Sequence, residues 1–150
     1  MDGLSTVDEQ LARDVAAYDE TRLRRVTAAV VRLGLDRAQV QDPRLDAALT
    51  RLDAAAWGDE DDPVRAAVRD LVEEWDEVAW DAQDVAESAE GDTAAYDAAF
   101  ARARAVSAVD FALDRDPLKA ALESAYEVQA GLGDLPAVAA VLRSSTPSAP

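Results

Sequence analysis

The chain has 150 residues, of which 49% are hydrophobic, and its 31 acidic against 15 basic side chains give a net charge of −16. It contains no cysteine and no histidine, and these absences exclude disulfide frameworks, thiolate nucleophiles, histidine-based catalytic triads and the usual zinc sites. The negative charge also disfavours nucleic acid as a partner, because the phosphates would be repelled.

The sequence shows no signal for export or membrane insertion. The first four residues lack the basic start and apolar centre of a signal peptide, and the longest aliphatic runs, over 28–31 and 137–142, are too short to cross a bilayer. We therefore expect a cytoplasmic protein without a membrane span. A chain of this length is most simply one domain, here residues 1–143, and the Ser/Pro-rich tail over 144–150 is expected to be flexible.

Helical start signals recur along the chain. Asp is a preferred N-cap, and Pro fits the first helical position because its missing N–H is not needed there. Asp-Pro occurs three times, at Asp42-Pro43, Asp62-Pro63 and Asp116-Pro117. Together with the apolar spacing, these signals predict five main helices, over residues 7–33, 43–57, 63–89, 92 or 93 to 114, and 117–130, with a short sixth over 136–143.

The first predicted helix carries further signals. Thr6 and Glu9 fit a capping box at its start, and Gly34 fits a C-terminal stop, as Gly131 does for the fifth helix. Residues 35–41 are predicted to be a connector. Arg22 interrupts the apolar stripe of this helix. We expect the aliphatic part of its side chain to lie along the core and its guanidinium to reach water. The alternative is a buried ion pair with the acidic third helix.

Short connections between successive helices, such as residues 58–62 and 115–116, favour antiparallel neighbours. No segment shows the alternation that is typical of strands. The predicted fold is therefore all-α, an antiparallel helical bundle of five main helices plus the short sixth. An α-solenoid of helix pairs is the structural alternative.

The helix predicted over 63–89 has the clearest pattern. Its apolar residues alternate in steps of four and three, which is typical of an a/d seam. The seam consists of Val64, Val68, Leu71, Trp75, Val78, Ala82, Val85 and Ala89. Val72, Ala79 and Ala86 widen it, and the opposite face is rich in Asp and Glu.

Most of the net charge lies in and before this helix: residues 58–92 hold fourteen acidic and two basic side chains, a balance of −12. One interpretation is a solvated face. It would be partly neutralised if the first helix packed beside it and brought up Arg22, Arg24, Arg25 and Arg32. The other interpretation is a docking surface for a basic protein partner, whose approach the charge would steer. The predicted protein-binding residues are Glu73, Asp76, Glu77, Trp80, Asp84 and Glu87.

Trp80 stands in the middle of the acidic face by its heptad position. Trp is enriched in the residues that dominate binding energy at interfaces, so an exposed Trp80 would favour the docking interpretation. The alternative is a core residue, covered by a helix that packs on the other side of the third helix.

The acidic loop over 59–62 invites comparison with calcium-binding loops. With Asp59 in the first position, Val64 stands where Gly is required and Asp70 where a bidentate Glu is preferred, so the EF-hand pattern fails. We therefore predict no metal site and no bound cofactor.

Residues 74–77, with the sequence EWDE, form a Glu-x-x-Glu pattern on one helix. This resembles the first half of the Mg²⁺ site in all-α nucleotide pyrophosphohydrolases of the MazG type, where a Glu-x-x-Asp on a later helix completes the site. The second half is missing, because residues 107–110, SAVD, have the Asp without the Glu. The resemblance implies a Mg²⁺-dependent hydrolase that uses Glu74 and Glu77.

We expect a non-catalytic protein-interaction module, of the inhibitor, immunity or adaptor type, that binds a basic partner through the acidic helix face. The alternatives are the Mg²⁺-dependent nucleotide pyrophosphohydrolase-like enzyme and a structural or homo-oligomeric helical protein whose charge only maintains solubility.

Overall fold

The computed structural model describes residues 3–88 and 93–144, and within them all regular secondary structure is helical. The all-α prediction is confirmed, but the described residues form eight helices instead of five and a short sixth. They are α1 Gly3–Val7, α2 Glu9–Ala16, α3 Glu20–Ala38, α4 Pro43–Asp53, α5 Pro63–Ser88, α6 Ala94–Ala112, α7 Pro117–Leu132 and α8 Leu135–Leu142. Ala89 and the tail over 145–150 lie outside the described residues.

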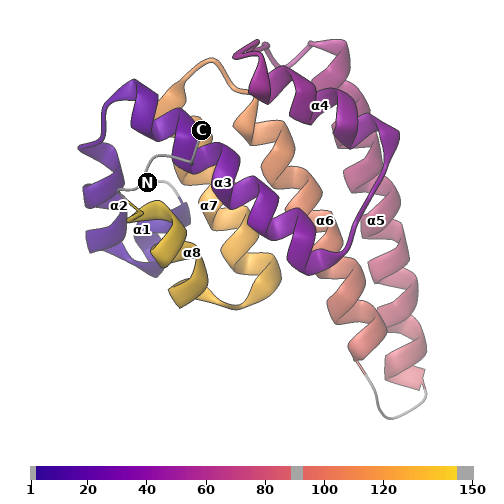
Figure 1. The fold of residues 1–150 in the computed structure, drawn as a ribbon. Coiled ribbons are helices and arrows are strands. Elements are labelled where there is room, and N and C mark those ends of the chain that lie inside the picture. Colours follow the sequence, from indigo (N-terminus) through magenta and orange to yellow (C-terminus); the bar gives the residue numbers. More distant parts are fainter. Residues whose placement is uncertain (1–2, 89–92, 145–150) are drawn as a thin grey trace.

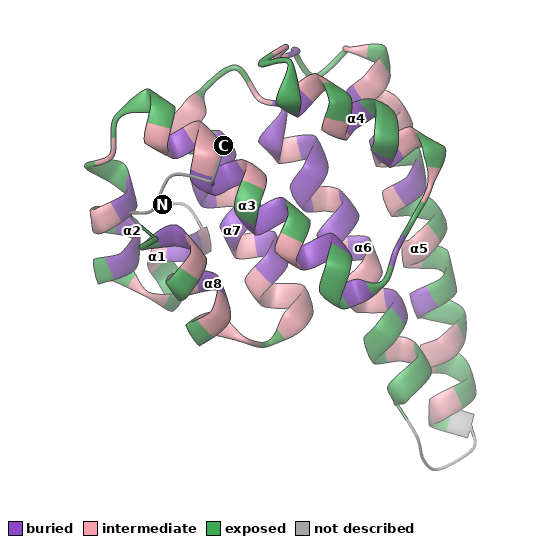
Figure 2. Cartoon of the chain, viewed as in Figure 1, coloured by how far each residue is buried: buried purple, intermediate pink, exposed green. Residues whose placement is uncertain are grey.

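Helices α3, α6 and α7 form the centre of the molecule, with α3 crossing α6 and α7 (Figure 1). Helices α1, α2 and α8 pack at one end, and α4 and α5 cover the other side of α6. Buried residues gather where the central helices meet, whereas the far end of the α5–α6 pair is mostly exposed (Figure 2). No helix in the described ranges combines the length and the apolar character needed to cross a membrane.

The prediction of one long helix over 7–33 is wrong, because two aspartates divide this segment. Asp8 accepts a hydrogen bond from the Leu11 amide at 3.0 Å and caps α2, and Asp19 accepts from the Arg22 amide at 2.8 Å and caps α3. Each carboxylate satisfies an amide that is left without a partner at a helix start, which favours a new helix over a continuous one. Thr6 makes no capping box; its hydroxyl donates to the Gly3 carbonyl.

Both glycines predicted as helix stops lie inside helices instead. Gly34 is buried in α3, and a Cβ there would meet Val128 Cγ2 at 2.8 Å; a Cβ at Gly131 would meet the Arg104 Cβ at 2.8 Å. These glycines therefore allow close approach of neighbouring helices. The helix ends use other residues with left-handed backbone: Gln39, with φ of 55°, closes α3, and Gly133, with φ of 63°, closes α7.

The three Asp-Pro starts are found where the sequence places them, at α4, α5 and α7. Asp42 accepts from the Arg44 amide at 2.9 Å, and Asp116 accepts from the Leu118 amide at 3.0 Å. Helix α4 ends four residues earlier than predicted, at Asp53. The Ala56 amide then donates to the Arg51 carbonyl at 2.9 Å, and the chain continues in the loop over 54–62.

The predicted seam of α5 is correct in its first half and wrong in its second. Val68 and Leu71 are 0% and 4% exposed, but Val78 and Val85 are 46% and 65% exposed, and Ala79 is the buried residue at 5%. Ala79 follows Val68 by eleven residues, about three turns of 3.6 residues, so both lie on the same side of α5. The seven-residue pattern instead places Val78 in the seam, about 100° further around the helix, where it is exposed.

The solvated-face interpretation allows for neutralisation of α5 by four arginines of the first predicted helix, but three of them contact other partners. Arg24 donates to the backbone carbonyls of Asp114 and Arg115, both at 2.8 Å, and Arg32 pairs with Asp53 of α4 at 2.9 Å. Half-buried Arg22 lies over the Tyr18 ring, with 3.6 Å from Cζ to the ring centroid. Its head thus rests on an aromatic face and makes no ion pair with α5 in the described residues.

Candidate functional site

The second half of α5 and the first half of α6 project beyond the other helices (Figure 1). We call this pair the arm; it comprises residues 76–88 of α5 and 94–104 of α6. A narrow line of small residues holds the two helices together, with Ala79, Ala99 and Ala103 at 5%, 1% and 0% exposure. Small side chains let the helix backbones approach closely, and they leave the larger side chains of the arm at its surface.

A groove of about 320 Å³ lies between the two helices of the arm. It is lined by Asp76, Ala79, Trp80, Tyr96, Phe100 and Arg104. The rings of Tyr96 and Phe100 are stacked, with centroids 5.9 Å apart and an angle of 24° between the planes. Trp80 is 66% exposed, so it is not a core residue. Three aromatic side chains from two helices therefore meet at one open groove.

Arg104 connects this groove to the body of the molecule. Its Nη1 donates to Glu127 Oε2 of α7 at 3.0 Å, and its Nη2 lies 3.5 Å from Asp76 Oδ1 of α5. Burial raises the pKa of Glu127, although the positive charge of Arg104 acts in the opposite direction. The guanidinium also lies 5.7 Å from the centroid of the Phe100 ring. One arginine thus fixes the position of α5, α6 and α7 at the base of the arm.

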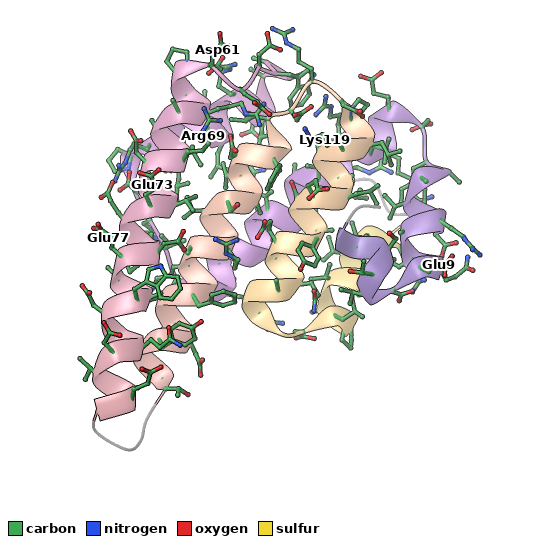
Figure 3. All side chains as sticks on the ribbon, turned by 180° about the vertical axis from the view of Figure 1, so that it is seen from behind. Glu9, Asp61, Arg69, Glu73, Glu77 and Lys119 are labelled. Atoms are coloured by element: carbon green, nitrogen blue, oxygen red, sulfur yellow. The ribbon has the colours of Figure 1, made fainter. Side chains whose placement is uncertain are left out.

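The predicted binding residues occupy two adjoining lines on α5. Glu73, Glu77, Asp84 and Glu87 are exposed and, with Trp80, recur at the three- and four-residue spacing of one helix face. Figure 3 shows Glu73 and Glu77 on the outer side of α5, away from α6. Asp76 instead lies in the groove and pairs with Arg104. Trp80 therefore stands where the acidic face meets the aromatic groove.

A second small cavity, of about 240 Å³, continues from the groove toward the end of the arm. It is lined by Gln83, Ala86, Glu87, Thr93 and Tyr96. Because Tyr96 belongs to both cavities, the two form one concave strip along the α5–α6 contact. Glu87 adds a carboxylate to this strip, as Asp76 does at its other end.

A buried charged cluster that the sequence pattern does not predict lies at the opposite end of α5. Arg65 is 3% exposed; its Nε donates to Asp110 Oδ1 and its Nη1 to the Gly58 carbonyl, both at 2.9 Å. Arg69 also donates to Asp110, at 3.2 Å. The only sequence signal is spacing: Arg65 lies three residues before Val68, on the buried side of the helix.

The rest of this cluster involves the start of α7. Lys119 Nζ lies 3.5 Å from Asp114 Oδ2, and Arg65 Nη1 lies 3.5 Å from the same oxygen. Burial by itself would raise the pKa of Asp114, but the Asp116 amide with Lys119 and Arg65 outweighs it and lowers the pKa. Each cation here has an acidic or carbonyl partner, so we interpret the cluster as structural: it fixes the loop over 54–62 to α6 and α7.

The acidic loop before α5 has a structural role as well. Asp62 caps α5 by accepting from the Val64 amide at 2.9 Å, and its two carboxylate oxygens accept from Arg51 at 3.1 and 2.9 Å. The Arg51 hydrogen bonds hold the pKa of Asp62 at about 2, below the ordinary 3.8. Asp59 pairs with Arg115 at 2.7 Å. Within residues 3–88 and 93–144, no three carboxylates come together in a group that could hold a metal ion.

The structure does not gather the carboxylates that the hydrolase alternative requires. Glu74 forms an ion pair with Arg44 of α4, and the hydrogen bonds from Arg44 lower its pKa. Glu77 points outward from α5 (Figure 3), and Asp110 is held by Arg65 and Arg69. Guanidinium groups thus engage Glu74, one of the two carboxylates that the resemblance to pyrophosphohydrolases assigns to Mg²⁺, and also Asp110, the acidic residue of the incomplete second half.

Comparison of this chain with protein-family models, with curated proteins and with solved structures finds no match. Helix α5 has two charged regions. In the buried cluster the charged groups pair with one another. The arm instead presents an aromatic groove and a line of exposed carboxylates to solvent. The arm is the stronger candidate for a functional surface.

Proposed function

We propose that this chain is a non-catalytic interaction module, which binds a basic segment of a protein partner along the acidic face of the arm. The observation that carries the proposal is Trp80, a large apolar side chain that is 66% exposed between Glu77 and Asp84 on one face of α5. In the free protein this side chain contributes little hydrophobic stabilisation, because most of its apolar surface stays in water. Binding a partner would remove it from water.

Charge and shape support the same surface. Trp, Tyr and Arg are the residue types enriched in the dominant contacts of protein interfaces, and the groove contains Trp80, Tyr96 and Arg104. The exposed carboxylates around them would attract a partner rich in Lys and Arg and speed its approach. This attraction is screened over about 8 Å at physiological ionic strength, so the proposed binding weakens as salt is added.

The arm is also suited to binding by its position. It projects away from the other helices (Figure 1), so a partner can approach both the outer acidic side and the groove without displacing any helix of the body. Ala79, Ala99 and Ala103 keep the two helices in contact in the free protein. The surface is therefore formed before the partner arrives, which lowers the entropic cost of association.

The test uses a synthetic helical peptide with Lys and Arg on one face and Leu on the other, titrated by isothermal calorimetry. The double variant Trp80→Ala/Glu77→Lys should weaken binding by at least about tenfold, since it removes the aromatic contact and reverses a charge. Glu9→Lys is the matched control: it makes the same charge change at the far side of the molecule (Figure 3) and should alter affinity by less than about twofold.

Circular dichroism shows whether the double variant keeps its helices, so that lost binding can be assigned to the surface. The proposal fails if the double variant and the Glu9→Lys control bind the peptide equally. It also fails if binding is unaffected by an increase from low to high salt, because an attraction between exposed charges must be screened.

A further inference from the structure

The groove of the arm has a composition that favours one kind of side chain. Resting on the proposed function, we propose that this groove receives an arginine side chain of the basic partner, whose guanidinium stacks on the exposed ring of Trp80 and the half-buried ring of Tyr96. The outer carboxylates attract the partner in general, whereas the groove selects arginine over lysine.

Arginine–aromatic contacts recur within this chain. Within the described residues, arginine lies over an aromatic ring at four places, and the distances from Cζ to the ring centroid range from 3.6 to 5.7 Å. The pairs are Arg22 on Tyr18, Arg24 on Trp57, Arg102 on Trp75 and Arg104 on Phe100. In the part of the chain that the structure describes, Trp57 and Trp75 each carry an arginine, and Trp80 carries none. Among the three tryptophans, Trp80 is thus the one whose ring is open to an arginine from a partner.

The charge around the groove favours a cation. Arg104 is the one positive group among the lining residues, and it is matched by Asp76 in the groove and by Glu127 behind it. Together these three groups have a net charge of minus one, and the exposed Glu77 and Glu87 make the surroundings of the groove more negative. Aromatic faces attract cations through their quadrupole, and the attraction grows where the cation loses water. An anionic or phosphorylated side chain would be repelled by the same surroundings.

The shape of the groove distinguishes arginine from lysine. Its volume of about 320 Å³ is at the lower end of the roughly 300–1,000 Å³ typical of ligand pockets, which suits one side chain. A guanidinium is planar and weakly hydrated, so it can stack on an indole or phenol ring and give up water at small cost. The ammonium of lysine is compact and strongly hydrated, so the same rings favour it less.

The experiment compares three helical peptides that are identical except at one central position, which is Arg, Lys or Leu, with all other basic residues Lys. Each is titrated into the full chain by isothermal calorimetry at low salt. We expect the Arg peptide to bind roughly fivefold more tightly than the Lys peptide, as a partly exposed cation–π contact allows. Trp80→Leu should abolish this preference, and the conservative Trp80→Phe should retain most of it.

Glu77→Lys separates this inference from the proposed function. It should weaken both the Arg and the Lys peptide by a similar factor and leave their ratio unchanged, because Glu77 faces outward from α5 (Figure 3). If the Arg and Lys peptides bind equally while Glu77→Lys weakens both, the acidic surface binds basic segments but the arginine inference is wrong. If no peptide is weakened by Glu77→Lys, the proposed function fails and the inference fails with it.

Two further outcomes would overturn the inference. Tightest binding of the Leu peptide would show that the groove takes an apolar anchor. The other is measured by light scattering: if the free chain is a dimer and Trp80→Leu is a monomer, the groove is occupied by a second copy of the chain. Circular dichroism of Trp80→Leu and Trp80→Phe confirms that both retain the helical content of the parent chain, which the high exposure of Trp80 leads us to expect.

Discussion

The first half of α5, residues 63–75, lies within the helical body, whereas the second half, residues 76–88, has α6 as its main neighbour (Figure 1). The first half is covered by both α4 and α6: Arg44 of α4 reaches Glu74, and Asp110 of α6 reaches Arg65. There even an arginine is buried. In the second half, Val78 and Trp80 are exposed.

The difference shows that the number of neighbours decides what a helix buries. A helix between two neighbours buries a broad face, which includes Arg65 once Asp110 and Asp114 compensate its charge. A helix with one neighbour buries only a narrow line, here centred on Ala79. The same acidic helix therefore serves as part of the core at one end and as an open surface at the other.

Of the changes along α5, Arg65→Met in the buried half is expected to lower the free energy of unfolding the most. The change leaves the buried Asp110 with only the more exposed Arg69, at 3.2 Å, and removes one of the two cations beside half-buried Asp114. Breaking a buried ion pair in this way typically costs about 3–5 kcal/mol of folding free energy. Urea unfolding monitored by circular dichroism measures the loss. Glu77→Gln, a change on the exposed half of the same helix, is the control and should shift the unfolding free energy by less than about 0.5 kcal/mol.

A second variant shows whether the loss comes from the charge that is left behind. Arg65→Met/Asp110→Leu removes both partners, so it should recover a large part of the stability that Arg65→Met alone loses. Equal instability of the single and the double variant would contradict the ion-pair account. It would assign the effect to the lost packing of the Arg65 stem instead.

A smaller effect is expected at the start of α5, where Arg51 holds the pKa of Asp62 at about 2. The folded-state pKa lies below the ordinary 3.8, so this carboxylate stabilises the fold above pH 4 and the contribution is lost as the pH falls toward 2. Asp62→Asn keeps an oxygen that can cap α5 but removes the charge that Arg51 binds, so it should cost about 1 kcal/mol at neutral pH.

Urea unfolding at several pH values measures this contribution. The stability of Asp62→Asn should fall less steeply between pH 4 and pH 2 than that of the parent chain. Asp81→Asn, on the exposed half of α5, should reproduce the pH dependence of the parent chain. Parallel curves for the parent chain and Asp62→Asn would show that the Arg51 contact does not stabilise the charged carboxylate.

Local chemistry made much of this fold predictable. Asp42, Asp62 and Asp116 mark the starts of three helices because a cap depends only on neighbouring amides. The features that the sequence does not predict depend on which helices meet. Gly34 reads as a stop signal, yet it is needed for the approach of α7, and Arg65 finds its partner Asp110 on another helix.

The candidate site likewise has one part that the sequence predicts and one part that it does not. Heptad position placed Trp80 and the carboxylates at Glu73 and Glu77 on the side of α5 opposite the seam, and these side chains are exposed. The other wall of the groove, made by Tyr96 and Phe100, comes from α6. It could not be predicted, because no periodicity within α5 indicates which face of α6 will lie beside it.

Amide hydrogen exchange along α5, measured by NMR in the free chain and with the central-Arg peptide bound, tests whether this helix has one buried half and one binding half. We predict slow exchange at residues 65–72 in both states, and faster exchange at residues 79–87 that slows when the peptide binds, because open helices with few buried contacts exchange through local opening. Equal protection of the two segments in the free chain, with exchange at 79–87 unchanged by the peptide, would contradict the division of α5 into a buried half and a binding half.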